Sequence, residues 1–351
     1  MDIINCGIDL HYKQSHFYFI DETTGKEFYR VIPTNRIQIS KMLDDFDDHS
    51  IQYAFETGTM ARYLYGILSG RSNTARIHVV HPKKFKVIVE SKHKNDKIDS
   101  KKLAEGLSKD YLPMPVYMKS ERCRRLQMLL NLRRSRVKNK VATVMQAKSI
   151  VRGLGIQKTG VITKKKGFER LAARVEEKSY DRHIIEKQFA SFIADLDAID
   201  EIELEIRDII LSDFSDEYSL LVTIPGIGFI TAASLLAKID TIDRFKNADA
   251  LSSYLGLVPS EHSSGQKVSH GTITKEGDTE TRWLLIQSAW TLIRLKKEDD
   301  LRGSALRKKF YRIAMKEKNT PKAIVAVARH LTRIVYGVLK SKTPYSGDIH
   351  V

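Results

Sequence analysis

The first third of the chain alternates between short apolar runs and stretches with the apolar spacing of a helix. Runs rich in β-branched and aromatic residues predict five strands, over residues 3–8, 15–20, 27–32, 51–55 and 77–80. Helical spacing follows the third, fourth and fifth strands, over residues 37–46, 60–68 and from 96 to about 111. This order of strands and helices is that of a ribonuclease-H-like domain. We therefore expect an α/β domain over residues 1–115.

Two long helices with opposite charge are predicted next. Residues 119–152 carry eleven basic residues and one acid, whereas residues 183–211 are mainly acidic. In the first helix, apolar residues at three- and four-residue steps predict one buried seam: Leu126, Leu130, Val137, Val141, Val144 and Val151. The two helices can pair with each other or with a second copy as a coiled coil, or the basic helix can bind nucleic acid. We expect a helical coiled-coil linker over residues 116–215.

The remaining residues, 216–345, predict an all-α domain. Helices on both sides of Pro225-Gly226-Ile227-Gly228 suggest a helix-hairpin-helix-like element, in which glycine amides approach a phosphate backbone. A tight turn between two buried helices is the alternative. Residues 256–267 are expected to form a polar loop rich in hydroxyls. The uncharged stretch from Ser219 to Ala237 is broken by proline and glycine, which favours buried helices over a membrane span.

Charge and cysteine content limit the classes of function. The formal net charge is +16, which implies a polyanionic partner such as nucleic acid; a basic protein without one is the alternative. Cys6 and Cys123 are far apart and show neither a disulfide framework nor zinc-site spacing, so a reducing cytoplasm fits. The first residues lack a basic leader with a full apolar core, so we expect no secretory signal.

Four acidic residues are candidates for metal-dependent chemistry. Asp96 and Asp99 lie three residues apart at the start of a predicted helix, which aims both carboxylates at one point. Asp9 ends the first predicted strand and Glu56 ends the fourth. If these strands are neighbours, the four carboxylates converge and can hold two metal ions such as Mg²⁺ for an in-line phosphoryl displacement. Taken singly, Asp9 can instead cap a turn, and Glu56 can be a solvated loop acid.

Five short motifs together resemble the DEDD transposases of insertion sequences, the IS110-type or Piv-like recombinases. They are Gly7-Ile8-Asp9, Phe55-Glu56-Thr57-Gly58, Asn95-Asp96-Lys97-Ile98-Asp99, Ile224-Pro225-Gly226-Ile227-Gly228, and Gly256-Leu257-Val258-Pro259 followed by Ser263-Ser264-Gly265. The resemblance spans nearly the whole chain, in the order that the family has.

The resemblance implies a fold, a site and partners. It implies a RuvC-like catalytic domain whose Mg²⁺-binding tetrad is Asp9, Glu56, Asp96 and Asp99. In the family's C-terminal transposase domain a serine is the nucleophile, and the matching residue is Ser264, with the adjacent Ser263 as the alternative. A coiled-coil linker would assemble a dimer or tetramer in the prokaryotic cytoplasm, at the nucleoid. A structured non-coding guide RNA would pair with the double-stranded donor and target DNA.

Charge and resemblance together indicate the residues that bind nucleic acid. They are Lys119, Arg124, Arg133, Arg134, Arg136, Lys138, Lys140, Gly226, Gly228 and Lys275. Three functions remain open. The first is a transposase or recombinase with Ser264 as covalent nucleophile. The second is a RuvC-type junction nuclease that uses water, and the third is a non-catalytic nucleic-acid-binding protein.

Overall fold

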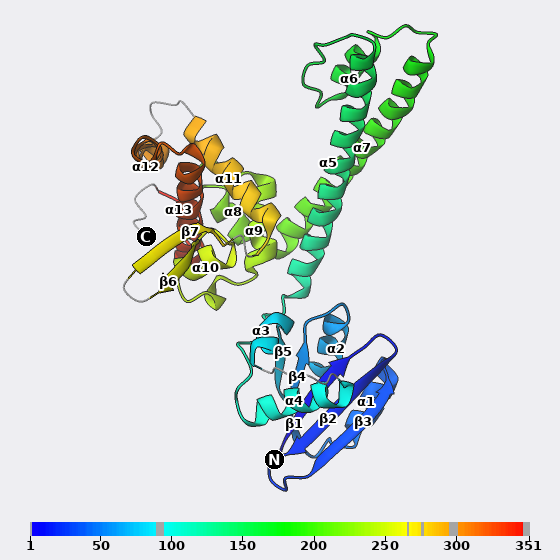
Figure 1. Ribbon diagram of the computed structural model, residues 1–351, viewed down its shortest axis with the longest axis vertical. Helices are drawn as coiled ribbons and strands as arrows, with labels where there is room; N and C mark the ends of the chain where they lie inside the picture. Colours follow the sequence, from blue (N-terminus) through cyan, green and yellow to red (C-terminus); the bar gives the residue numbers. More distant parts are fainter. Residues whose placement is uncertain (1, 89–94, 265–266, 275–276, 295–300, 347–351) are drawn as a thin grey trace. The chain divides into compact units, whose positions relative to one another are not determined.

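Contacts within the chain divide the computed structural model into two units, Met1–Met118 and Lys119–Val351 (Figure 1). The structure describes residues 2–88, 95–264, 267–274, 277–294 and 301–346. Each unit buries hydrophobic residues of its own. No helix among these residues is long and apolar enough to cross a membrane. Cys6 and Cys123 are both buried free thiols, one in each unit.

The first unit is built on a mixed sheet of five strands. They are β1 (Ile3–Leu10), β2 (Gln14–Asp21), β3 (Glu27–Pro33), β4 (Ser50–Glu56) and β5 (Thr74–Val80). The strand order is β3-β2-β1-β4-β5; β1 to β3 are antiparallel, and β4 and β5 run parallel to β1. The expected α/β domain is confirmed. Its likeness to RuvC stays a prediction.

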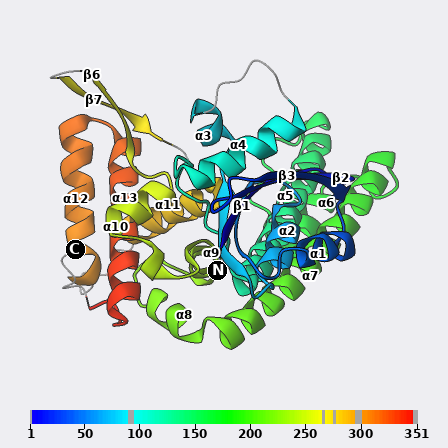
Figure 2. The same ribbon diagram turned by 90° about the horizontal axis from the view of Figure 1, so that it is seen from below.

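Helices cover both faces of this sheet (Figure 2). They are α1 (Arg36–Asp44), α2 (Ala61–Leu68), α3 (Pro82–Ile88) and α4 (Asp96–Ser108). Ile39 of α1 and Leu64 of α2 share one core with Phe55 of β4. The adjacent residue Ala54 packs on the other face with Leu103 of α4. Since neighbouring residues of a strand point to opposite faces, α4 lies on the face opposite to α1 and α2, and Phe85 of α3 packs in the same cluster as Leu103.

Two long helices lie side by side in the second unit (Figure 1). They are α5 (Glu121–Gly153) and α7 (Tyr180–Asp213), and the unpredicted α6 (Lys165–Ala172) packs at one end of the pair. Arg133 Nε lies 2.7 Å from Glu203 Oε1, so the basic helix pairs with the acidic helix of the same chain. The predicted helical region is confirmed, and supercoiling stays a prediction. Val141 is 48% exposed, so its predicted place in the seam is wrong.

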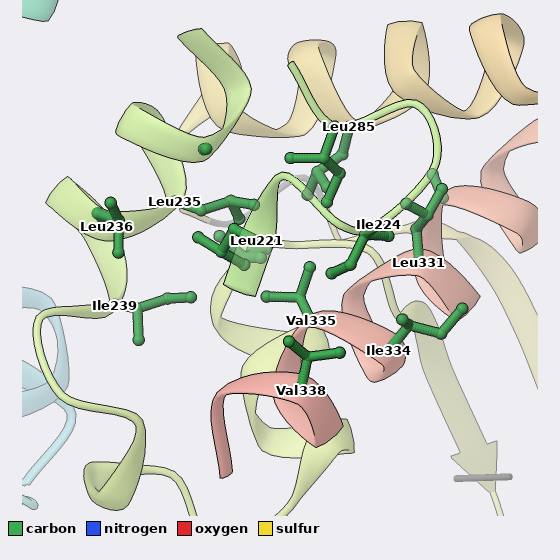
Figure 3. Packing of buried hydrophobic residues seen from close by; sticks show 14 of the residues in the cluster. Leu221, Ile224, Leu235, Leu236, Ile239, Leu285, Leu331, Ile334, Val335 and Val338 are labelled. Atoms are coloured by element: carbon green, nitrogen blue, oxygen red, sulfur yellow. The ribbon is translucent and has the colours of Figure 1, made fainter. Parts of the chain in front are cut away.

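A cluster of helices forms the rest of the second unit. It contains α8 (Ser215–Leu221), α9 (Phe229–Ile239), a 3₁₀ helix (Ile242–Arg244), α10 (Ala248–Tyr254), α11 (Thr279–Arg294), α12 (Leu301–Glu317) and α13 (Thr320–Ser341). Figure 3 shows the core, in which Leu221, Leu235, Leu285 and Val335 come together from α8, α9, α11 and α13. Asn319 caps α13: its side chain accepts a hydrogen bond from the Lys322 amide.

The all-α prediction for this region is wrong in one respect. Residues expected to form a polar loop lie instead in a two-stranded antiparallel hairpin of β6 (Pro259–Ser264) and β7 (Lys267–Ile273). The residues of β6 are mostly polar, so they show no apolar alternation. Cross-strand pairing with the more β-branched β7 satisfies their backbone groups, which a single-strand pattern does not reveal.

Candidate functional site

The close approach of β1 and α4 brings acidic residues together. Gly7 of β1 lies directly against the helix, since a Cβ at this position would be 2.0 Å from the carbonyl oxygen of Ser100 and 2.4 Å from the amide nitrogen of Ala104. Asp9 is two residues further along β1 and therefore points to the same face as Gly7. The absence of a side chain at Gly7 thus lets the first turn of α4 reach Asp9.

The first turn of α4 holds two of the predicted acids. Asn95 is the N-cap residue, and its side-chain oxygen accepts a hydrogen bond from the Lys97 amide at 3.1 Å. Asp96 and Asp99 follow within this turn. Carboxylates are favoured there because the helix dipole is positive at its N-terminus. The helix start therefore offsets part of the repulsion between the two acids.

The pKa of Asp9 shows that Asp96 and Asp99 lie close to it. Burial is the largest cause that raises this pKa above its ordinary value, and the charges of Asp96 and Asp99 raise it further. His11 opposes them through its charge and a hydrogen bond. Three of the four predicted acids therefore lie close enough to repel one another, and a cation between them would relieve that repulsion.

The fourth acid, Glu56, is brought to the same region by strand register. Ile8 of β1 pairs with Phe55 of the parallel strand β4, so Asp9 and Glu56 are the next residues of the two strands. Neighbouring strands are about 5 Å apart, and both residues follow one that packs on the opposite face. Asp9 and Glu56 therefore share the face that α4 covers.

Two histidines and a tyrosine also belong to this site, and sequence reasoning missed them. His11 Nε2 lies 3.1 Å from Asp9 Oδ2 and 3.7 Å from Asp96 Oδ1. His16 Nε2 lies 3.2 Å from Asp96 Oδ2, and its Nδ1 forms a 2.6 Å hydrogen bond with the Tyr29 hydroxyl. His16 is the cross-strand partner of Asp9 in the β1–β2 hairpin. This pairing depends on strand register, so the sequence pattern gave no direct signal for His16.

These side chains fit a divalent cation. Asp9, His11 and Asp96 each offer one ligand atom, and the three atoms lie within 4.8 Å of one another. The buried Nε2 of His16 makes no hydrogen bond with acceptable geometry, although Asp96 is near. Carboxylate oxygens suit Mg²⁺ and Mn²⁺, and imidazole nitrogen is a further ligand type for transition metals. We call Asp9, Glu56, Asp96 and Asp99 with His11 and His16 the acidic site.

The candidate nucleophile lies in the other unit. Ser264 ends β6, where it pairs with Lys267 of β7, and Ser263 pairs with Val268. The acidic site belongs to the unit Met1–Met118 and the hairpin to the unit Lys119–Val351. The predicted metal ligands and the candidate nucleophile therefore belong to different units.

Most of the predicted basic contacts on α5 have partners inside the chain. Four arginines form ion pairs: Arg124 with Glu121, Arg133 with Glu203, Arg134 with Glu280 and Arg136 with Asp195. Lys119 Nζ donates a hydrogen bond to the carbonyl oxygen of Ala237 at 2.9 Å. Within the described part of the chain, Lys138 and Lys140 form no ion pair, so they carry the unpaired charge of this set. Lys275 lies outside the described residues.

The two glycines of the predicted hairpin differ in their surroundings. Gly226 has a φ of +85°, and a Cβ there would lie 2.5 Å from the carbonyl oxygen of Ser288 in α11. This packing accounts for Gly226 without a ligand, which is the tight-turn alternative. Gly228 precedes α9, is exposed and has open space around its Cα. Of the two, Gly228 keeps the access that a phosphate contact needs.

Two family models match the chain. Residues 218–303 match the model described as "Transposase IS116/IS110/IS902 family". Residues 6–156 match a second model, of DEDD transposases of the IS110 type, described as "Transposase". The second match contains Asp9, Glu56, Asp96 and Asp99, and the first contains Ser264.

Similar proteins come from several bacteria. A transposase for insertion sequence element IS1111A of Coxiella burnetii is 26% identical over 76% of this chain and 72% of its own length. A transposase for insertion sequence element IS1328 of Yersinia enterocolitica is 26% identical over 81% of this chain and 82% of its own. The pilin gene-inverting protein of Moraxella bovis is 32% identical over 44% of this chain and 47% of its own.

Proposed function

This chain belongs to the IS116/IS110/IS902 family of transposases, and we propose that it cleaves and exchanges DNA strands through a serine-linked intermediate. The observation that best supports this chemistry is the meeting of Asp9 with Asp96 and Asp99 on the face of β1 that α4 covers. Glu56 ends the adjoining parallel strand. Such a set of acids suits phosphoryl transfer, in which positioned charge supplies most of the catalysis.

The proposed metal ligands are Asp9, Glu56, Asp96 and Asp99, and the proposed ion is Mg²⁺. When bound, Mg²⁺ would act as a Lewis acid toward the attacking and leaving oxygens of the phosphate. The chain's own groups hold the carboxylates in place. The N-terminus of α4 favours the charge of Asp96 and Asp99, and His16 beside Asp96 restricts that carboxylate.

The proposed nucleophile is the hydroxyl of Ser264. In the first step a bond forms between Oγ and phosphorus while one phosphate ester bond of the DNA strand breaks. The serine proton leaves to a base, and the departing deoxyribose oxygen takes up a proton. A serine hydroxyl is a weak nucleophile at neutral pH, so an activating group is required beside it. The phosphoserine ester keeps the energy of the broken bond, so the strand can be rejoined without ATP.

Substitution of two adjacent serines tests this proposal. Ser264→Ala should abolish both the denaturant-resistant protein–DNA adduct and recombination, whereas Ser263→Ala, the matched control, should retain both. The assay uses DNA that carries the ends of the insertion sequence and denaturing gels to detect the adduct. Cleavage that persists in Ser264→Ala would instead support a RuvC-type junction nuclease that uses water. Nucleic-acid binding without any cleavage by the parent, unchanged by Asp9→Asn or Asp99→Asn, would support a non-catalytic nucleic-acid-binding protein.

We further propose a structured guide RNA and a homo-oligomer, dimer or tetramer, as partners. The net charge of +16 and the unpaired Lys138 and Lys140 on α5 support an RNA partner. Sequencing the RNA that co-purifies with the protein tests this part. One enriched RNA species from the non-coding end of the element is expected, and no RNA above background would contradict it. Light scattering of the purified protein would give the oligomer number.

A further inference from the structure

Helices α12 and α13 bring together basic side chains that neither the predicted binding residues nor the proposed chemistry includes. Lys309 Nζ of α12 lies 3.1 Å from Nδ1 of His330 in α13. Burial lowers the pKa of Lys309, and the charges of Arg333, Arg312 and Arg329 lower it further. We call Lys309, Arg312, Arg329 and Arg333 the α12–α13 basic cluster.

His330 holds this cluster together as a neutral group. Burial, followed by the charges of Lys309 and Arg333, lowers the pKa of His330 to about 4. At neutral pH its imidazole is therefore uncharged, and Nδ1 can accept a hydrogen bond from the Lys309 ammonium. The lysine is thus fixed beside three arginines instead of extending into solvent.

The chain supplies little negative charge to this cluster. In the described ranges, Asp249 is the one acid that forms an ion pair with a member of it, at 3.1 Å from Arg329 Nη2. The Nε of Arg333 is buried and has no hydrogen-bond partner. Repulsion between these cations lowers the stability of the fold, and so does a buried donor without a hydrogen-bond partner. A bound anion would offset the repulsion among the cations.

We propose that the α12–α13 basic cluster binds successive phosphates of a nucleic-acid backbone. This inference rests on the proposed function, because a transposase must bind nucleic acid. The inference identifies a surface that binds it. Arg329 and Arg333 are one helical turn apart, with a rise of about 6 Å. Lys309 reaches His330 from α12, and Arg312 follows three residues later on that helix. The cations of the cluster are spread over two helices, so they suit a ligand with several phosphates in a row, such as a nucleic-acid backbone. Guanidinium groups can bind a phosphate in a bidentate manner.

Charge-neutralising variants of the full-length protein test this proposal. Lys309→Gln and Arg333→Gln remove cluster cations, and Arg312→Gln removes an exposed one in case the first two disturb folding. Lys322→Gln is the matched control, because it removes the same charge from α13 but from a lysine already paired with Glu317 at 2.8 Å. Binding is measured by fluorescence anisotropy over a salt series, without divalent metal. The probes are a duplex DNA and a hairpin RNA of equal length.

Each cluster variant should bind duplex DNA about eightfold more weakly than the parent at 0.1 M salt, with a salt slope smaller by about 0.9. Lys322→Gln should keep the parental slope. A loss of affinity for only the DNA or only the RNA probe would support the proposal and identify the nucleic acid that the cluster binds. A loss of affinity for both probes would indicate a backbone contact common to them. Parental affinity and slope for both probes in all three variants would overturn it.

This experiment is independent of strand cleavage. It can be repeated in the Ser264→Ala background, so failure of the proposed serine chemistry leaves its outcome unchanged. Thermal unfolding of the same variants provides a second readout. Because each substitution removes a cation from among like charges, the variants should unfold at or above the parental temperature in the absence of nucleic acid. A drop in unfolding temperature for exposed Arg312→Gln would contradict the repulsion on which the proposal depends.

Discussion

His16 and Tyr29 form a 2.6 Å hydrogen bond that joins β2 to β3 beside the acidic site. The other imidazole nitrogen of His16 lies 3.2 Å from Asp96. Three groups on β3, β2 and α4 therefore form a chain that ends at a proposed metal ligand. Groups that contact a ligand fix its orientation and raise the affinity for metal. The buried imidazole would thus position Asp96 without contacting DNA.

Removing the tyrosine hydroxyl should weaken metal binding. Tyr29→Phe deletes the partner of His16 Nδ1 and frees the ring to turn away from Asp96, so we expect the affinity for Mg²⁺ and Mn²⁺ to fall about tenfold. Isothermal titration calorimetry on the protein without DNA measures it. Tyr12→Phe is the control, because Tyr12 is 81% exposed. Equal affinities of Tyr29→Phe and the parent would show that the chain of contacts does not support the ligand.

Gly7 should be essential for the acidic site although it has no side chain. Gly7→Ala places a Cβ in the space of the Ser100 carbonyl and forces α4 away from β1. We expect a loss of about 2 kcal/mol in the free energy of unfolding, together with weaker metal binding. Urea unfolding and calorimetry measure the two effects.

Gly66→Ala is the matched control for this substitution. Gly66 lies within α2, and a Cβ there meets no atom within 4 Å. Alanine is a better helix former than glycine, so this variant should be more stable than the parent by up to about 1 kcal/mol. Similar destabilisation by the two alanines would contradict the packing argument for Gly7.

Local patterns predict the elements of this chain better than their contacts. The five strands and the long helices were predictable because their apolar residues follow the periods of strand and helix. Val141 shows the limit: it fits the predicted seam of α5, yet it is exposed while Thr143 is buried. Small deviations from the ideal helical period accumulate over a helix of 33 residues, and sequence alone does not locate the contact with α7.

The same distinction holds for the acidic site. The shared helical turn of Asp96 and Asp99 was predictable from their spacing, and the positions of Asp9 and Glu56 from the strand pattern. Their role as metal ligands stays a prediction. The place of His16 was not predictable, because it depends on its pairing with Asp9 across the β1–β2 hairpin and on Tyr29 from β3. Such contacts depend on strand register, which apolar alternation in a single strand does not specify.

Removing the charge of Arg136 should lower the stability of the protein more than removing the charge of Lys138. Arg136→Gln leaves the carboxylate of Asp195, which is 6% exposed, without its cation, so we expect a loss of about 2 kcal/mol in unfolding free energy. Lys138→Gln should change stability by less than about 0.5 kcal/mol, because the lysine is exposed. Urea unfolding measures both values.

The affinity for nucleic acid should instead fall more in Lys138→Gln than in Arg136→Gln. Lys138 carries unpaired charge, so its loss should reduce affinity for duplex DNA and hairpin RNA more than the loss of Arg136, which is already paired within the chain. Anisotropy titrations at fixed salt make the comparison. A larger loss of affinity for Arg136→Gln would indicate that the arginine leaves Asp195 to contact phosphate.

Replacing Asp9 should stabilise the metal-free protein while it removes metal binding. Burial and the charges of Asp96 and Asp99 raise the pKa of Asp9 in the folded state above its ordinary value of 3.8. The folded protein therefore binds this proton more tightly than the unfolded chain, and stability falls as pH rises through the raised pKa. Asn carries no charge, so Asp9→Asn should unfold at a higher temperature than the parent at neutral pH. This difference should shrink as pH falls toward 3.8.

Divalent metal should make the parent more stable than Asp9→Asn. At a concentration 100 times the dissociation constant, a ligand that binds only the folded state adds about 2.7 kcal/mol to the free energy of unfolding. The parent should gain that stability on addition of Mg²⁺ or Mn²⁺, and Asp9→Asn should gain none. Asp2→Asn, which removes an exposed acid from the same end of the chain, should behave as the parent in both conditions. Equal stabilisation of Asp9→Asn and the parent by metal would show that Asp9 is not a ligand of the stabilising ion, and it would contradict the proposed metal site.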